Sequence, residues 1–311
     1  MNKRILLGIL FGGLVAIIAL AGFGIFQMQN FKRKLEPALN ESLAQISKKA
    51  PYFRTKLDYA PFECQGLVFI ECKSPYVNIF VEGFKQEMFS SRDLTLSLKE
   101  IDFKSVTLGV SSQLQYGNFG DLQEYVQAFF PQDFQLDLTF KPQDSKSYTV
   151  RTELLLNAQN AQYIQDLTSL IDSPRVQEMG LFKHISSFAF LDEGAKIQNL
   201  EFSLVSKNLS DKLFQIMQSK YGASLNKQAY ITLAKFLAGA FLEGFSSKSY
   251  YPQMRELTES FLQVVLWNAN KMQVFITPKS QTQPYNFSTT NLDPTLDTLF
   301  SLYHFNIKLS K

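Results

Sequence analysis

Apolar residues follow three different patterns along this chain, and each pattern predicts a different kind of element. Residues 5–26 form a run of 22 residues without a charge. In residues 31–49 apolar side chains recur at helical spacing, and in stretches between residues 94 and 156 they mostly alternate with polar ones, as in half-buried strands. The patterns therefore predict a membrane segment, then a helix, then a β-rich region.

The uncharged run is long enough to cross a bilayer, because about 20 residues at about 1.5 Å each span a hydrocarbon core of about 30 Å. Since basic residues flank both of its ends, the positive-inside rule does not set the orientation. The flanking residues, which we expect at the lipid headgroups, are Lys3, Arg4, Lys32, Arg33 and Lys34.

A cleaved signal peptide is the alternative interpretation of the N-terminus. Lys3 and Arg4 would then be its charged region, residues 5–18 its apolar region, and Ala19-Leu20-Ala21 an A-x-A cleavage site. We favour an uncleaved anchor, because the apolar run continues to Phe26. We therefore expect a single-pass inner-membrane protein with its C-terminal domain in the periplasm or, alternatively, a secreted protein.

Residues 31–49 predict an amphipathic helix, with Leu35, Leu39, Leu43 and Ile46 on one face. Pro37 lies early in this segment and Pro51 lies beyond its end. We expect this helix to carry the chain off the bilayer and to pack on its own domain or on a partner.

The β-rich region contains clear hairpin signals. In the stretch DLTLSLKEIDFKSVTLGV, apolar positions change parity across Lys99-Glu100, which predicts a turn or bulge between antiparallel strands. Residues 134–140 and 148–156 alternate on either side of the turn-rich KPQDSKS, which predicts a hairpin. A second hairpin is expected from Phe188 and Phe190, through Asp192-Glu193-Gly194, to residues 200–204.

Residues 153–171 and 201–219 resemble each other at an offset of 48, which suggests a repeated β-β-α unit. Each is expected to run from a strand through an asparagine-containing turn into an amphipathic helix. Asn208 or Ser210 would cap the second helix, and Asp211 suits its first turn. Further helices are expected at 226–245 and 252–270, and short strands at 272–276 and 305–309.

Together these elements predict an α+β fold. An N-terminal transmembrane helix would precede an antiparallel β-rich domain with amphipathic helices packed on it, more helical in the C-terminal half. The expected regions are a membrane segment (1–30), an amphipathic helix (31–50), a β-rich region (51–150) and an α+β region with the suggested repeats (151–311).

Cys64 and Cys72 are the two cysteines of the chain, and we favour a disulfide between them. An eight-residue step separates Cα atoms by about 26 Å in a strand and by about 12 Å in a helix. A bridge needs about 7 Å or less, so the chain must reverse between the cysteines, and Gly66 is the obvious turn residue. Such a bridge would indicate an oxidising compartment.

Other roles for the two cysteines fit the sequence less well. A pair of buried free thiols is the alternative that stays open. Zinc binding fits poorly, because only His184 and His304 could complete the ligands, and a redox role fits poorly because C-x-x-C is absent.

No sequence motif marks an active site. P-loop, G-x-G-x-x-G, G-x-S-x-G, H-E-x-x-H and EF-hand patterns are absent, so no catalytic, cofactor-binding or metal-binding residue is assigned. His184 and His304 precede predicted strands, where structural or surface roles explain them. A hydrolase with dispersed acidic residues stays as the enzymatic alternative, since paired acids follow no local spacing rule.

Charge argues against a nucleic-acid partner. The chain carries +3, and once Lys3 and Arg4 are set aside the rest has 29 basic and 28 acidic residues. No basic stripe stands out beyond residues 32–34. In the membrane segment, Gly8, Gly12 and Ala16 form a small-residue ridge that would support weak self-association at most.

The layout resembles the AsmA-like and related uncharacterised periplasmic proteins of Gram-negative envelopes. The resemblance rests on the short basic N-terminus, the single membrane segment and amphipathic strands such as DLTLSLKEIDFKSVTLGV. It covers architecture along most of the chain and no diagnostic motif. It implies a role in envelope maintenance or lipid handling at the inner membrane, and it carries over no functional residue.

The sequence thus favours a non-enzymatic envelope protein that binds a lipid or an envelope partner. The 29 phenylalanines and the one-faced strands would offer a wide apolar surface of the kind that accepts acyl chains. A secreted interaction protein released after Ala21 and the hydrolase are the alternatives.

Overall fold

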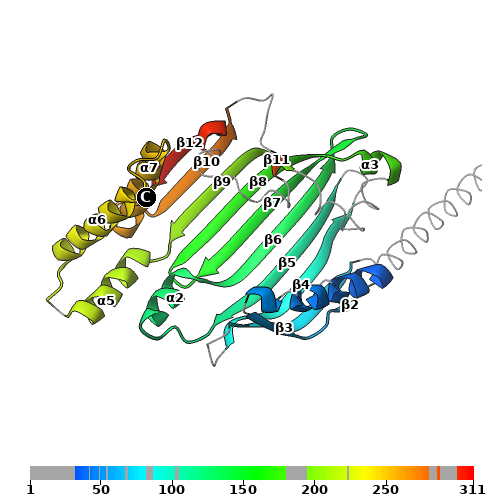
Figure 1. Cartoon of the computed structure of the whole chain (residues 1–311), viewed down its shortest axis with the longest axis horizontal. Helices are drawn as coiled ribbons and strands as arrows, with labels where there is room; N and C mark the ends of the chain where they lie inside the picture. Colours follow the sequence, from blue (N-terminus) through cyan, green and yellow to red (C-terminus); the bar gives the residue numbers. More distant parts are fainter. Residues whose placement is uncertain are drawn as a thin grey trace, which may run out of the picture.

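The fold is described from a computed structural model of the chain (Figure 1). It describes residues 32–41, 43–48, 50–53, 55–66, 69–81, 87–101, 105–179, 195–222, 224–279, 286–287 and 300–311. The expected membrane segment, Lys3, Arg4, His184 and the turn at 192–194 lie outside these ranges. Among the described residues, no helix has the length and apolarity to cross a bilayer.

Within the described ranges, twelve strands form one antiparallel sheet (Figure 1). From β3 to β10 every strand pairs with the next along the chain, β12 pairs with β10, β1 and β2 pair with β3, and β11 pairs with β9. The strands are β1 (Thr55–Tyr59), β2 (Glu63–Gln65), β3 (Glu71–Val81), β4 (Glu87–Ile101), β5 (Val106–Tyr116), β6 (Pro131–Pro142), β7 (Ser147–Ala158), β8 (Ala161–Asp172), β9 (Ala195–Ser206), β10 (Lys271–Pro278), β11 (Asn286–Phe287) and β12 (Tyr303–Ser310).

The alternation of the sequence gives this sheet one apolar face and one polar face. The pairing places Leu138 opposite Leu108 on β5 and opposite Thr152 on β7, and Leu167 opposite Leu200 on β9. We call this apolar side the inner face. The side that carries Asp137, Arg151, Glu153, Asp166 and Glu201 is the outer face.

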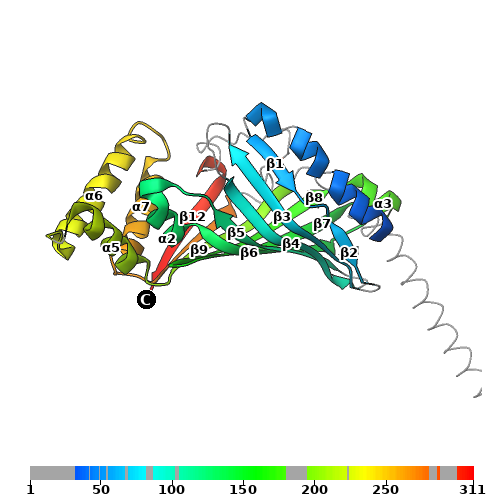
Figure 2. The ribbon, with the colours of Figure 1, turned by 90° about the horizontal axis from the view of Figure 1, so that it is seen from below.

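Helices cover the inner face at its two ends (Figure 2). At one end lie the helical residues 32–41 and 43–48 and α3 (Pro174–Met179); at the other lie α5 (Leu209–Tyr221), α6 (Lys227–Glu243) and α7 (Tyr251–Val265). α2 (Gln123–Phe129) lies beside α5, where the Tyr125 hydroxyl donates to Met217 Sδ over 3.0 Å. The short helices η1 (Ala50–Phe53) and η2 (Gly120–Leu122) precede β1 and α2.

Each helical end has its own hydrophobic core. In the first core Leu35, Leu43 and Val176 pack with sheet residues such as Leu98 and Phe140. In the second, Leu209, Leu213 and Val264 pack with sheet residues such as Leu204 and Met272. The sheet is therefore anchored by helices at both ends of one face.

The structure confirms an antiparallel β-rich sheet with additional helices. The strands around residues 94–110, the hairpin of 134–140 with 148–156, and the helices near 226–245 and 252–270 are all present. The parity change at Lys99-Glu100 is a bulge, since the β4–β5 register shifts between Leu98 and Glu100. Residue 150, the expected end of the β-rich region, lies inside β7, and one sheet contains strands from both sides of it.

The suggested β-β-α repeat is wrong in its first copy. Residues 161–172, expected to be a helix, form β8, which pairs along its length with both β7 and β9. Gln159 and Asn160 make a two-residue hairpin loop before it. The helical spacing of Ile164, Leu167 and Ile171 is thus outweighed by backbone pairing on both sides.

Two finer expectations also need correction. Ile46 does not share the buried face of its helix, because its side chain is 56% exposed while Leu35 and Leu43 are buried. Asn208 precedes α5 but makes no capping hydrogen bond through its side chain; instead the Ser206 hydroxyl accepts from the Leu209 N–H over 3.1 Å. Asp211 lies in the first turn as expected.

Candidate functional site

The structure contains the Cys64–Cys72 disulfide. The two residues face one another directly in the β2–β3 pairing, with their Cα atoms 3.9 Å apart. Gly66 makes the reversal possible with a φ of +97°, and a Cβ there would stand 1.8 Å from the Phe69 carbonyl oxygen. The bridge therefore closes a hairpin that only glycine permits at this position.

The bridged hairpin holds the first described helix. The Asn40 side chain donates from Nδ2 to the Phe62 carbonyl over 3.1 Å and accepts from the Phe62 N–H over 2.6 Å. The Glu36 carboxylate accepts from the Cys64 N–H over 2.9 Å. These bonds satisfy backbone groups of Phe62 and Cys64 with side chains of the helix. Lys32, Arg33 and Lys34, the expected headgroup contacts, begin this helix.

Between the two helical ends, apolar side chains of the inner face stay half-buried. The strand register aligns them in two rows across the sheet. One row contains Val110, Leu136, Leu154, Gln165, Phe202 and Val274, and the other contains Leu108, Leu138, Thr152, Leu167, Leu200 and Ile276. We call the half-buried middle of these rows, on β6 to β9, the apolar rows.

The outer face presents paired charges instead. Arg151 binds Asp166 through two nitrogens, at 2.6 and 3.1 Å, and this hydrogen bond raises the pKa of the guanidinium. Lys99 pairs with Asp137 over 2.5 Å, and Gln273 donates to Glu201 over 2.7 Å. A charged, solvated face needs no cover, whereas the apolar rows do.

The carboxylates of the outer face lie in a network of paired polar groups. Asp137, Glu153, Asp166 and Glu201 line a shallow groove of about 370 Å³. Each of them already has a cation or an amide as a partner, and Glu153 pairs with Arg151 over 3.0 Å. Partly exposed carboxylates that are paired in this way suit a solvated charge network better than proton transfer.

The described part of the chain offers no cluster of three metal-ligating side chains. His304 lies in β12 on the outer face, opposite Thr277, and is exposed.

α6 carries a second apolar surface. Phe236, Leu237 and Phe241 are 70%, 53% and 52% exposed, although the helix buries Tyr230 and Leu242 against its neighbours. Lys235 lies beside them and is also exposed. Large side chains of this kind, grouped on one helix, mark a surface that meets a membrane or another protein.

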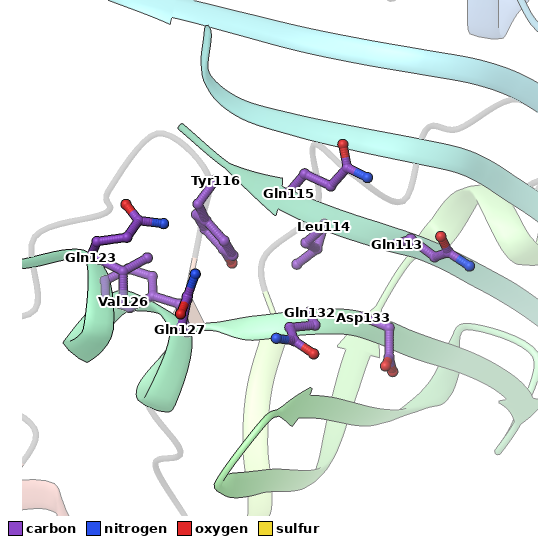
Figure 3. A pocket seen from close by; sticks show the side chains of 10 residues that line it. Gln113, Leu114, Gln115, Tyr116, Gln123, Val126, Gln127, Gln132 and Asp133 are labelled. Carbon is purple, nitrogen blue, oxygen red and sulfur yellow. The ribbon is translucent and has the colours of Figure 1, made fainter. Parts of the chain in front are cut away.

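A polar notch opens where β5 and β6 separate (Figure 3). Their pairing ends at Gln113 and Asp133, because η2 and α2 are inserted between the two strands. The notch has a volume of about 760 Å³ and is lined by Gln113, Leu114, Gln115, Tyr116, Gln123, Val126, Gln127, Phe130, Gln132 and Asp133. Sequence reasoning missed this site, since its residues come from three elements whose meeting depends on the turn around α2.

Comparisons with family models, with curated proteins and with solved structures find no match for this chain. The geometry of the sheet is therefore the basis for a functional proposal.

Proposed function

We propose that this protein is a non-enzymatic, inner-membrane-anchored periplasmic protein whose sheet binds the hydrocarbon part of a lipid. The observation that carries the proposal is the set of apolar rows, which lie half-buried between two helical ends on one face of a single sheet. Apolar side chains in a wide, one-sided surface are a natural contact for acyl chains.

The dimensions of the rows suit such a ligand. The apolar rows cross β6 to β9, four adjacent strands that lie about 4.8 Å apart, so each row is roughly 14 Å long. Each methylene group transferred there from water would contribute about 0.8 kcal/mol. A chain of several methylenes thus supplies binding energy without any charged partner.

Other features support the compartment and the membrane association. The disulfide suits an oxidising compartment. The uncharged run at 5–26 is long enough for a membrane anchor, and the exposed phenylalanines of α6 with Lys235 suit a bilayer surface. The resemblance to AsmA-like envelope proteins agrees with lipid handling.

Leu167→Lys tests the proposal, because it places a charge in the middle of the apolar rows. Thr168→Lys is the matched control, since Thr168 is the next residue of β8 and faces the outer side opposite Arg151. Full-length protein purified from membranes is analysed by organic extraction and mass spectrometry. We expect wild type and Thr168→Lys to retain lipid and Leu167→Lys to lose most of it.

Gln165→Leu keeps the test informative if the lysine variant folds poorly. Gln165 interrupts an apolar row between Leu154 and Phe202, so a leucine there extends the surface and should raise lipid retention. Wild-type protein without lipid, or equal retention in all variants, contradicts the proposal.

N-terminal sequencing of the native protein separates the anchored form from the secreted alternative. An intact N-terminus supports the anchor. A start at Gly22 would show cleavage after Ala21 and remove the membrane tether from the proposal.

A further inference from the structure

The notch between β5 and β6 differs chemically from the apolar rows. Its lining has no lysine or arginine, and its one carboxylate, Asp133, accepts a hydrogen bond from Asn157 Nδ2 over 2.8 Å. Five of the ten lining residues are glutamines. The site is thus polar and nearly uncharged, which disfavours phosphate groups and cations as ligands.

Four of these glutamines have exposed side chains, and two of them, Gln127 of α2 and Gln132 of β6, lie on the side of the notch opposite β5 (Figure 3). Gln123 is structural, since its Oε1 accepts from the Phe119 N–H over 2.8 Å. The side chains of the others are exposed: Gln113, Gln115, Gln127 and Gln132. Each amide offers two donors and an acceptor, which match neighbouring hydroxyl groups that themselves donate and accept.

An aromatic wall completes the notch. Tyr116 packs edge-to-face with Phe89 and with Phe130, with ring centroids 5.6 and 5.4 Å apart, and Phe130 is 48% exposed. The Tyr116 hydroxyl donates to the Pro131 carbonyl over 2.8 Å, which fixes the ring, and burial raises the pKa of this phenol. Figure 3 shows Tyr116, Leu114 and Gln127 around the centre of the notch, with Gln132 and Asp133 at its β6 side.

We propose that this notch binds an uncharged sugar. Amides for the hydroxyl groups, an aromatic wall for the C–H face of the ring and a nearly neutral lining are the features that recognise such a ligand. The volume of about 760 Å³ lies within the usual range for small-molecule sites. The sugar belongs either to a free oligosaccharide or to the headgroup of a glycolipid.

The test uses the full chain in phosphatidylcholine nanodiscs, with maltotriose as the free sugar and digalactosyl diacylglycerol as the glycolipid. Binding of maltotriose is followed by saturation-transfer NMR, and the glycolipid by its enrichment around the protein after exchange between nanodiscs. The test variant is Gln127→Leu with Gln132→Leu, and the control is Gln135→Leu, an exposed glutamine of β6 that does not line the notch.

Losing one or two neutral hydrogen bonds should weaken sugar binding about tenfold in the double variant and leave the control unchanged. Such a loss for maltotriose assigns a free sugar; the same loss for digalactosyl diacylglycerol alone assigns a glycolipid headgroup. If neither probe binds, or if the double variant binds as the control does, the proposal is wrong. Leu167→Lys should keep maltotriose binding, so failure of the lipid proposal and failure of this one are distinguishable.

Discussion

Removing the Cys64–Cys72 bridge tests whether the β2–β3 hairpin is held together by the crosslink. The two cysteines lie eight positions apart, and the chain-entropy relation for a loop of this size gives about 2.5 kcal/mol. The first described helix is bonded to β2 and the residue before it through Glu36 and Asn40. Breaking the bridge should therefore also weaken the contact between this helix and the hairpin. We therefore expect reduction to lower the free energy of unfolding by about 2 to 3 kcal/mol.

The assay compares three forms of the full chain in the same detergent: oxidised wild type, reduced wild type, and Cys64→Ala with Cys72→Ala. Urea unfolding gives the free energy, and hydrogen exchange gives local protection of the Phe62 and Cys64 amides. Reduced wild type isolates the crosslink, because it keeps both sulfur atoms. The alanine variant should lose slightly more, since Cys64 and Cys72 are buried and truncation leaves a cavity.

The hydrogen-exchange pattern decides the interpretation. Loss of protection at Phe62 and Cys64, with little change in the central strands, is the expected result, because β2 is a short strand at the margin of the sheet. Equal stability and equal protection in all three forms would refute the reasoning and show that the noncovalent contacts alone hold the hairpin.

Three further substitutions have defined outcomes. Gly66→Ala forces a Cβ to within 1.8 Å of the Phe69 carbonyl oxygen, so we expect a loss of about 2 kcal/mol or more in urea unfolding and a larger fraction of free thiols by mass spectrometry. Asn40→Ala removes both bonds to the Phe62 backbone, which should cost about 2 kcal/mol and expose the Phe62 amide to hydrogen exchange. Burial raises the pKa of Tyr230 to about 12. The contribution of its neutral form to the free energy of unfolding is therefore complete below pH 10 and is lost as the pH rises to 12. Wild type should then lose about 2 to 3 kcal/mol more than Tyr230→Phe across that range in urea unfolding.

Matched controls exist for each of these substitutions. Gly120→Ala keeps a positive φ of +57° but meets no atom within 4 Å, so it separates backbone strain from the steric clash at Gly66. Gln45→Ala changes an exposed residue of the next helical stretch, 43–48. Tyr221→Phe removes the same hydroxyl from a tyrosine that is 65% exposed. A control that behaves like its test variant contradicts the corresponding prediction.

The sequence predicted those elements whose local pattern and tertiary environment agree. Residues 134–140 and 148–156 alternate strictly around a turn-rich segment, and they pair as β6 and β7. Lys99-Glu100 changes the parity of the apolar positions, and the register shifts there. Cys64 and Cys72 required a reversal near Gly66, which the hairpin provides.

Other features depend on interactions that no local pattern contains. β8 has apolar residues at spacings that fit a helix, and only its pairing with β7 and β9 makes it a strand. The rows of the inner face follow from the strand order and from which helices cover which end. The notch requires Gln127 of α2 to lie near Tyr116 of β5, and this depends on how the chain turns between β5 and β6.

The bonds from Asn40 and Glu36 have a mechanical consequence for the proposed envelope protein. They hold the first described helix to the chain of the β2–β3 hairpin at three backbone groups, so we expect the helix and the hairpin to reorient together. If Lys32, Arg33 and Lys34 at the start of this helix are held at a bilayer surface, the inner face then keeps one direction relative to the membrane plane. Lipid entering or leaving the apolar rows would therefore approach from one side only.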